Sequence, residues 1–284
     1  MLSEIKEHGL KYIPMAYITD GKPNYEVFNS SKEFYDFFKR IQSGAIMTTT
    51  QLNLFEMKEY FERLLKETDG DIIHFTLSSG MSGTYQCASD AAEEINTKLK
   101  ADGKAKKIYV IDSLGATQTI CHLVDYAVNL RDEGKAADQI VKESEEFRNH
   151  QQIYITVNDL SHLKRGGRIS GVSAAVGTLL NIKPIIIIND EGKLVVHAKE
   201  MGMKKALTFM INAIKKYGLN TTKQTIIIGH TGQHMYEYAK ELAQKIKDEV
   251  KCDATVKHIG TVIGTHLGPD SVALVFNGKN RLHK

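Results

Sequence analysis

Strand-like and helix-like segments alternate along the first half of this sequence, and that order restricts the fold more than any other feature. Residues 72–77 and 107–111 are short, apolar and strand-like. Apolar residues recur with helical spacing in three segments, at residues 83–100, 118–131 and 136–148. The resulting order of strand, helix, strand and helix predicts a mostly parallel sheet that is covered by helices.

The second half has a different pattern. Residues 184–188 and 194–197 flank the turn-forming sequence NDEG, which predicts an antiparallel hairpin. Further strands are expected at residues 153–157, 225–229, 254–259 and 271–276, a short helix or turn at 159–164, and helices at 203–217 and 235–250. Because a chain of 284 residues commonly forms about two domains, we expect an α/β protein with a first domain at residues 1–149 and a mixed α/β second domain at residues 150–284.

Composition argues against several classes of partner and location. The 37 basic and 34 acidic residues give a net charge of only +3, and Trp is absent, so neither a basic nucleic-acid surface nor a base-stacking platform is indicated. Cys87, Cys121 and Cys252 form no CxxC pair and are odd in number, which is typical of reduced thiols. No signal peptide and no membrane-length apolar run is found. We therefore expect a cytoplasmic protein of bacterial or organellar type.

Several familiar catalytic and binding motifs are missing from the sequence. It contains no GxGxxG that opens a helix, no GxxxxGK[ST], no HExxH and no GxSxG. His230 and His234 stand four residues apart, a spacing that suits a metal if the segment is helical. Thr231 and Gly232 lie between them just after a predicted strand, so we expect a loop and no metal site there.

The segment 163–187, LKRGGRISGVSAAVGTLLNIKPIII, joins a basic glycine turn to a run with little polar bulk. Consecutive amides in such a turn form nests for anions, and glycine allows close approach of a neighbour. Two interpretations stay open at this point: a charged ligand head beside an apolar wall, or a basic turn that enters a buried helix. The turn consists of Lys164, Arg165, Gly166, Gly167 and Arg168.

Three polar clusters are further candidate binding motifs. The first is TTTQ at residues 48–51, and the second is SSGMSGTY at residues 78–85, which follows a strand and opens a helix. Hydroxyls at the carboxyl end of a parallel strand suit a carboxylate ligand, and they equally suit a helix cap. The third is GTHLGPD at residues 264–270, which predicts that His266 lies in a glycine-rich loop and is a candidate site residue.

Taken in order, the motifs resemble one family. TTTQ, SSGMSGTYQCA, IDS, LKRGGRIS, LLNIKPII and GTHLGPD occur along the chain as they do in the DegV family, bacterial fatty-acid-binding proteins that partner a fatty-acid kinase. The resemblance covers nearly the whole chain. It implies a two-domain DegV-like fold that holds one long-chain fatty acid between the domains, with the acyl chain in an apolar tunnel that lies mostly in the second domain.

The resemblance also implies roles for particular residues. Thr49 and Ser82 match the hydroxyls that hold the carboxylate, Thr50 replaces the family's usual Ser, and His266 matches a nearby His. Residues 172–180 become a candidate tunnel wall. Under this resemblance, Arg168, Gly166 and Gly167 are expected at the rim of the pocket. Lys164 and Arg165 are expected to dock a partner.

The resemblance implies a carrier rather than an enzyme. In the family, a kinase phosphorylates the bound carboxylate, so the carrier itself needs no catalytic residue, metal or cofactor. The expected ligand is a long-chain fatty acid, and the expected partners are a fatty-acid kinase and, transiently, a membrane, in the supply of acyl groups to phospholipid synthesis.

The chain departs from the family pattern at two places. The family normally begins with a strand that leads into an Asp-Ser motif, whereas this sequence starts at what reads as the following helix, so the first strand is expected to be missing. After Asp112 and Ser113, the family's small residues are partly replaced by Thr117, Gln118 and Thr119, which we expect to reshape the pocket mouth.

Two other functions remain open from the sequence. One is an enzyme that acts on a small anionic substrate, with His266 as acid or base. The other is a regulatory interaction protein that uses Lys164 and Arg165 of the basic turn.

Overall fold

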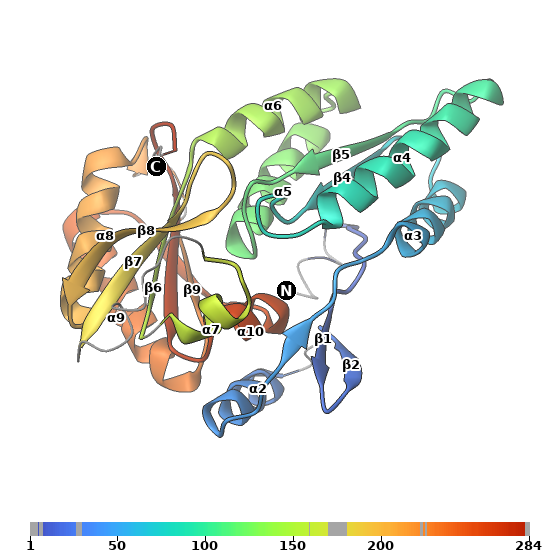
Figure 1. Cartoon of the computed structure of the whole chain (residues 1–284). Helices are drawn as coiled ribbons and strands as arrows, with labels where there is room; N and C mark the ends of the chain where they lie inside the picture. Colours follow the sequence, from blue (N-terminus) through green and yellow to red (C-terminus); the bar gives the residue numbers. More distant parts are fainter. Residues whose placement is uncertain are drawn as a thin grey trace.

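The computed structural model of the chain describes residues 5, 8–26, 30–158, 160–169, 181–221, 224 and 226–281. The candidate tunnel wall at residues 172–180 and most of the first seven residues therefore lie outside the described part. Figure 1 shows that the elements before residue 150, in blue to green, lie beside those after residue 150, in yellow to red. The division of the chain into domains at this point stays a prediction.

A six-stranded mixed sheet organises the second half. Its strand order is β10-β9-β11-β6-β7-β8, in which β9 and β10 are parallel and every other neighbouring pair is antiparallel. The predicted hairpin is confirmed as β7 and β8, which pair around the NDEG turn. The strands are β6 (Gln151–Val157), β7 (Ile182–Ile188), β8 (Leu194–Met201), β9 (Ile226–His230), β10 (Ala254–His258) and β11 (Ser271–Asn277).

The two faces of this sheet bury different apolar sets, because side chains alternate along each strand. On β6, Tyr154 packs with α8 (Met203–Tyr217) and α9 (Gln233–Val250), whereas Ile153 and Ile155 face the other way. The second face packs against two short helices, α7 (Ser161–Arg165) and α10 (Thr261–Leu267). It is this second face that looks toward the first half of the chain (Figure 1).

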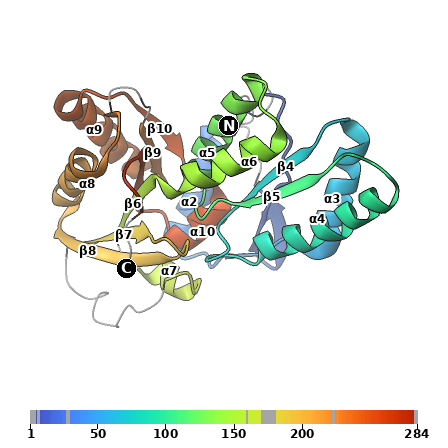
Figure 2. The same ribbon diagram turned by 90° about the horizontal axis from the view of Figure 1, so that it is seen from above.

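The first half contains the parallel strands β4 (Ile72–Thr76) and β5 (Ile108–Asp112) with helices on both sides. The helices are α3 (Leu54–Glu67) and α4 (Thr84–Ala101) on one side and α5 (Gln118–Asp132) and α6 (Ala137–Asn149) on the other. Both ribbon views place α5 and α6 between this strand pair and the six-stranded sheet (Figures 1 and 2). The predicted α/β fold, with a parallel pair in the first half and a mixed sheet in the second, is confirmed.

An antiparallel sheet in the first half was not predicted. Its order is β2-β1-β3, from β2 (Lys22–Tyr25), β1 (Ala16–Thr19) and β3 (Thr48–Thr49). These strands have two to four residues and little apolar alternation, so they give no strand signal in the sequence. The helix α2 (Ser31–Gln42) begins after its cap Ser30, whose hydroxyl accepts a hydrogen bond from the Glu33 amide.

The prediction that His266 lies in a loop is wrong: it lies on the helix α10. Glycine usually weakens a helix, but Gly264 lets α10 approach α2, because a Cβ at that position would lie 2.4 Å from Cζ of Phe38. Gly268, at φ 79°, ends the helix. The glycines of this motif therefore serve close packing and termination rather than a loop.

Glu26, just after β2, fastens the small antiparallel sheet to α10. Its carboxylate accepts hydrogen bonds from the amides of Thr261 and Val262 in the first turn of α10. A Cβ at residue 260 would lie 1.5 Å from Oε1 of this carboxylate. Only glycine therefore leaves room for the contact. Burial raises the pKa of Glu26 to about 7, and the two amide hydrogen bonds partly oppose that shift.

We expect this contact to make stability depend on pH. Because the pKa of Glu26 is raised from 4.5 to about 7, the folded state binds the proton more tightly than the unfolded state, and stability falls as pH rises through 7. The loss should be about 1 kcal/mol between about pH 6 and 8 in chemical denaturation. Glu26→Gln should remove this loss, whereas Glu59→Gln on the exposed face of α3 should keep it. A loss of equal size in Glu26→Gln would contradict the assignment.

Candidate functional site

A pocket of about 210 Å³ lies between the two halves of the chain. Its apolar wall belongs to the inner face of the six-stranded sheet and to α10. Representative residues of this wall are Ile153 and Ile155 on β6, Ala273 and Val275 on β11, and Val262 and Ile263 on α10. The polar lining residues include Thr49 and Ser82 from the first half and Arg168 and His266 from the second, so the pocket has a polar part and an apolar part.

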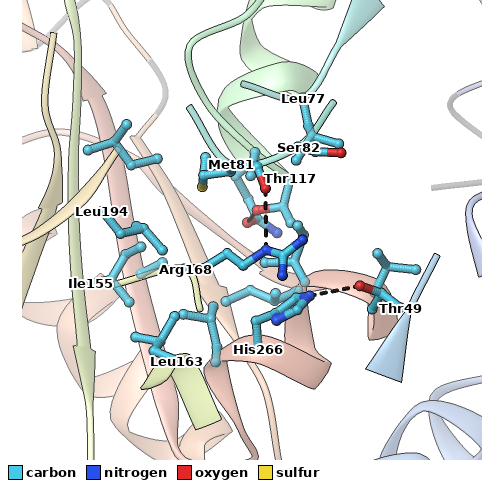
Figure 3. Close-up of a pocket in the computed structure, with 18 of the residues that line it drawn as sticks. Thr49, Leu77, Met81, Ser82, Thr117, Ile155, Leu163, Arg168, Leu194 and His266 are labelled. Atoms are coloured by element: carbon cyan, nitrogen blue, oxygen red, sulfur yellow. Dashed lines mark hydrogen bonds between the residues drawn. The ribbon is translucent and has the colours of Figure 1, made fainter. Parts of the chain in front are cut away.

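The four residues predicted to hold a carboxylate all line this pocket, and Arg168 joins them. The hydroxyl of Thr49 lies 2.9 Å from Nε2 of His266 and is hydrogen-bonded to it (Figure 3). Thr50 is exposed and lies beside Thr49. The predicted site residues Thr49, Thr50, Ser82, Arg168 and His266 are therefore brought together from four separate parts of the chain.

Thr49 is positioned by the small antiparallel sheet. It pairs with Tyr17 on β1, and the amide of Thr50 donates to the carbonyl of Ala16 at 3.2 Å. The segment that looked like a hydroxyl cluster in the sequence is thus a short strand whose end reaches the pocket. Pairing with β1 presents the Thr49 hydroxyl to His266, which comes from the other half of the chain.

Ser82 lies in the loop between β4 and α4. Its amide donates to the carbonyl of Ser78, and its hydroxyl lies 3.0 Å from the Thr84 hydroxyl and also accepts from the Thr84 amide. Ser78 docks the loop on the NDEG turn by donating to the carbonyl of Gly192 at 2.8 Å. The loop is close enough that a Cβ on Gly80 would lie 2.6 Å from the carbonyl oxygen of Glu191. Ser82 therefore helps to start the helix and also faces the pocket.

His266 is uncharged at neutral pH. Burial lowers its pKa, the nearby positive charge of Arg168 lowers it further, and the resulting value is about 4. A neutral imidazole has one donor and one acceptor nitrogen, so it supports the Thr49 hydroxyl without adding a charge. The same low pKa makes His266 a poor general base near neutral pH, where a useful base has a pKa close to the working pH.

The basic glycine turn packs directly on His266. A Cβ at Gly166 would lie 2.2 Å from Nδ1 of His266, and a Cβ at Gly268 would lie 2.5 Å from the ring of His162. These two glycines let α7 and α10 approach each other. This contact was not predicted, because nothing in the local sequence pairs residue 166 with residue 266.

Arg168 joins the turn to the Ser82 loop. Its Nε donates to the carbonyl of Met81 at 3.3 Å (Figure 3), and its Nη1 donates to the carbonyl of Gly166. Arg165 and Gly167 are exposed, Lys164 is half-buried, and none of the three is among the residues that line the pocket. Arg165 instead hydrogen-bonds His162.

The pocket also contains residues that sequence reasoning did not select as binding residues. Gln51 is the last residue of the TTTQ motif, and the motif alone is the signal that could have marked it as a binding residue. Met15 and Met81 are apolar residues with no sequence signal for a site. Thr117 and Gln118 line the pocket at the start of α5, whereas Thr119 is not among the lining residues, and a role for them in shaping the pocket mouth stays a prediction.

Within the described residues, no group of three His, Cys, Asp or Glu side chains is arranged to hold a metal ion. His230 ends β9 and its ring hydrogen-bonds the carbonyl of Thr231, whereas His234 lies in α9 against Asp270. None of the helices in the described part of the chain is both long and apolar enough to cross a membrane.

A family model described as an uncharacterised protein of the DegV family matches residues 2–279. The chain belongs to the DegV family. A DegV domain-containing protein of Clostridium perfringens is 34% identical over 281 residues, which are 98% of this chain and 94% of the relative.

Two solved structures share the fold of this DegV-family chain over most of its length. A fatty-acid-binding DegV family protein from Streptococcus agalactiae is 29% identical, with a TM-score of 0.78 over 95% of this chain and 92% of the other. A DegV family protein from Thermus thermophilus, described for its fatty acid binding, is 25% identical, with a TM-score of 0.83 over 98% of this chain and 95% of the other.

The low pKa of His266 gives a direct test of this site in the DegV-family chain. NMR titration of the unliganded protein should show the His266 ring neutral down to about pH 5, in keeping with its pKa of about 4. Arg168→Gln removes a nearby positive charge and should raise that pKa. Arg165→Gln, which removes a contact to His162 instead, should leave it unchanged. A His266 pKa near 6.5 in the unsubstituted protein would show that the ring is not buried as described.

The packing of the turn on His266 gives a second test. Gly166→Ala places a methyl group against the imidazole and should destabilise the protein by about 1–3 kcal/mol while shifting the His266 ring resonances. Gly70→Ala is a matched control, because the nearest side-chain atom to its added Cβ is 3.8 Å away. Chemical denaturation and the NMR spectrum of His266 measure both effects, and equal behaviour of the two variants would contradict the contact.

Proposed function

We propose that this DegV-family chain binds one long-chain fatty acid in the pocket between its two halves. The observation that carries the proposal is the chemical division of the pocket, with hydroxyls, a neutral His and an Arg on one side and an apolar sheet face on the other. A fatty acid has the same division between its carboxylate and its acyl chain. The fatty acid binding named for the Streptococcus agalactiae and Thermus thermophilus proteins supports the same ligand class.

The head of the ligand needs donors, because an unpaired buried carboxylate is very costly. Thr49 and Ser82 supply hydroxyl donors from two different elements, and the neutral ring of His266 holds the Thr49 hydroxyl in place. Thr50 adds a third hydroxyl at the exposed edge, and Arg168 adds a positive charge close by. Together these groups satisfy a carboxylate that stays near the protein surface.

The tail of the ligand is stabilised by burial. Each buried methylene contributes roughly 0.8 kcal/mol, so an acyl chain of about 16 carbons gains about 11 kcal/mol before ordering costs. The inner face of β6 and β11 offers Ile153, Ile155, Ala273 and Val275 to that chain. The gain from the tail exceeds what the few hydrogen bonds of the head contribute, so the head mainly sets orientation.

We further propose that the protein is a carrier and not an enzyme. The low pKa of His266 makes it ineffective as a base near neutral pH, and the surrounding hydroxyls are suited to holding an anion. A fatty-acid kinase then phosphorylates the carboxylate at the pocket edge, where Arg168 is exposed, and docks on Lys164 and Arg165. The acyl phosphate serves phospholipid synthesis, with transient membrane contact. The free thiols of Cys87, Cys121 and Cys252 suit a cytoplasmic location.

Loss of the head contacts should weaken binding selectively. Thr49→Val and Ser82→Ala each remove one hydroxyl from the carboxylate, and we expect each to weaken palmitate binding by about tenfold or more in calorimetry. Thr97→Val, which removes an exposed hydroxyl of α4 far from the pocket lining, is the control and should bind as the unsubstituted protein does. Unchanged affinity in both pocket variants would refute the proposed head site.

A further inference from the structure

Two further polar side chains, not among the four residues assigned to the carboxylate, line the pocket. Thr117 and Gln118 stand at the start of α5, whereas Thr49 lies on β3 and Ser82 in the β4–α4 loop. Gln118 is only 2% exposed. Figure 3 shows Thr117 across the pocket from Ile155 and Leu194, which belong to the apolar wall. Thr117 thus faces the apolar wall that is proposed to contact the acyl chain.

Gln118 reaches across to the second half of the chain. Its Nε2 donates to the carbonyl of His258 at 2.8 Å, at the end of β10. Its Oε1 lies against Gly229 on β9, where a Cβ would be 2.8 Å away, and Ile259 lies on the same side. Gly229 is therefore the residue that leaves room for the amide. Ile259 also lines the pocket, so the amide reaches the apolar wall rather than the surface.

The pair is held in a fixed arrangement. The Thr117 hydroxyl donates to Oε1 of Gln118. The backbone of Thr117 has φ 48° and ψ −111°, a combination that β-branched residues rarely adopt and that surrounding contacts must hold in place. Both side chains are thus positioned before any ligand arrives, which lowers the ordering cost of a hydrogen bond to them.

The pair keeps hydrogen-bonding capacity for a ligand. A Gln side chain has two N–H donors and two acceptor lone pairs, and a hydroxyl has one donor and two acceptor lone pairs. The contacts above use one N–H and one lone pair of Gln118 and the proton of Thr117. A pure hydrocarbon chain that covers the remaining donor and acceptor groups removes their hydrogen bonds to water and replaces none of them. A hydroxyl on the chain can both donate a hydrogen bond to these groups and accept one from them.

We propose that this pocket prefers long-chain fatty acids that carry a hydroxyl group between their two ends, and that Gln118 and Thr117 bind that hydroxyl. The inference rests on the proposed fatty acid binding and narrows its ligand class. A second carboxylate is a poorer match for this position, because Gln118 and Thr117 are both neutral and a buried charge requires a compensating charge. Gln118 is a specificity residue in this account and takes no part in chemistry.

The test compares stearic acid with 3-, 10- and 12-hydroxystearic acids by calorimetry on the full chain. A site built around a hydroxyl discriminates against the ligand that lacks it, so at least one of the 10- and 12-hydroxy acids should bind about five- to tenfold more tightly than stearic acid. Gln118→Met keeps the size of the side chain and removes its amide, and this variant should reverse the preference. Gln244→Met removes an exposed amide of α9 that does not line the pocket and should leave the preference unchanged.

Each other outcome has a distinct meaning. Tight binding of stearic acid with equal or weaker binding of every hydroxy acid overturns this inference and leaves the proposed function intact. Failure to bind any of the acids overturns the proposed function itself. An equal loss for all ligands in Gln118→Met shows that the amide only ties α5 to β10, and it also overturns the inference. If Gln118→Met melts at a markedly lower temperature, the ratio of hydroxystearic to stearic acid affinity is measured in Thr117→Val instead.

Discussion

The packing of the helix α10 against the first half of the chain determines the geometry of the pocket. Gly264 lets α10 approach Phe38 of α2, and Glu26 caps its first turn from the end of the β1–β2 hairpin. On its other side, α10 presents His266 to Thr49 and apolar residues to the cavity. One short helix therefore joins the small antiparallel sheet, the basic turn and the six-stranded sheet around a common space.

The elements with strong apolar periodicity could be predicted from the sequence, and those built from long-range contacts could not. The NDEG turn motif predicted the β7–β8 hairpin, and the helical spacing of apolar residues predicted the helix α4. The strands β1 to β3 are too short for a pattern, and α10 reads as a loop because its glycines serve contacts with distant residues. The Gly166–His266 contact joins residues one hundred positions apart, which no single-sequence pattern records.

The candidate site handles charge with few ionic groups of its own. Thr49, Ser82 and Thr50 offer hydroxyls, and burial keeps His266 neutral. These four residues therefore carry no charge that would need a counter-ion when no ligand is bound. Arg168 supplies positive charge from a turn that is exposed to solvent. This arrangement suits a ligand that must enter and leave. In a fully buried ion pair, departure of the ligand would leave an unpaired buried charge in the protein, which is costly. Reversible binding is the property that the proposed carrier role requires.

The central claim is that one long-chain fatty acid occupies this pocket. Native mass spectrometry of the protein as purified, with organic extraction of the bound species, tests that claim most directly. The account predicts a protein mass increased by one fatty acid and the same acid in the extract. Repeated preparations with the mass of the bare chain, which also take up no fatty acid when it is added, would contradict it.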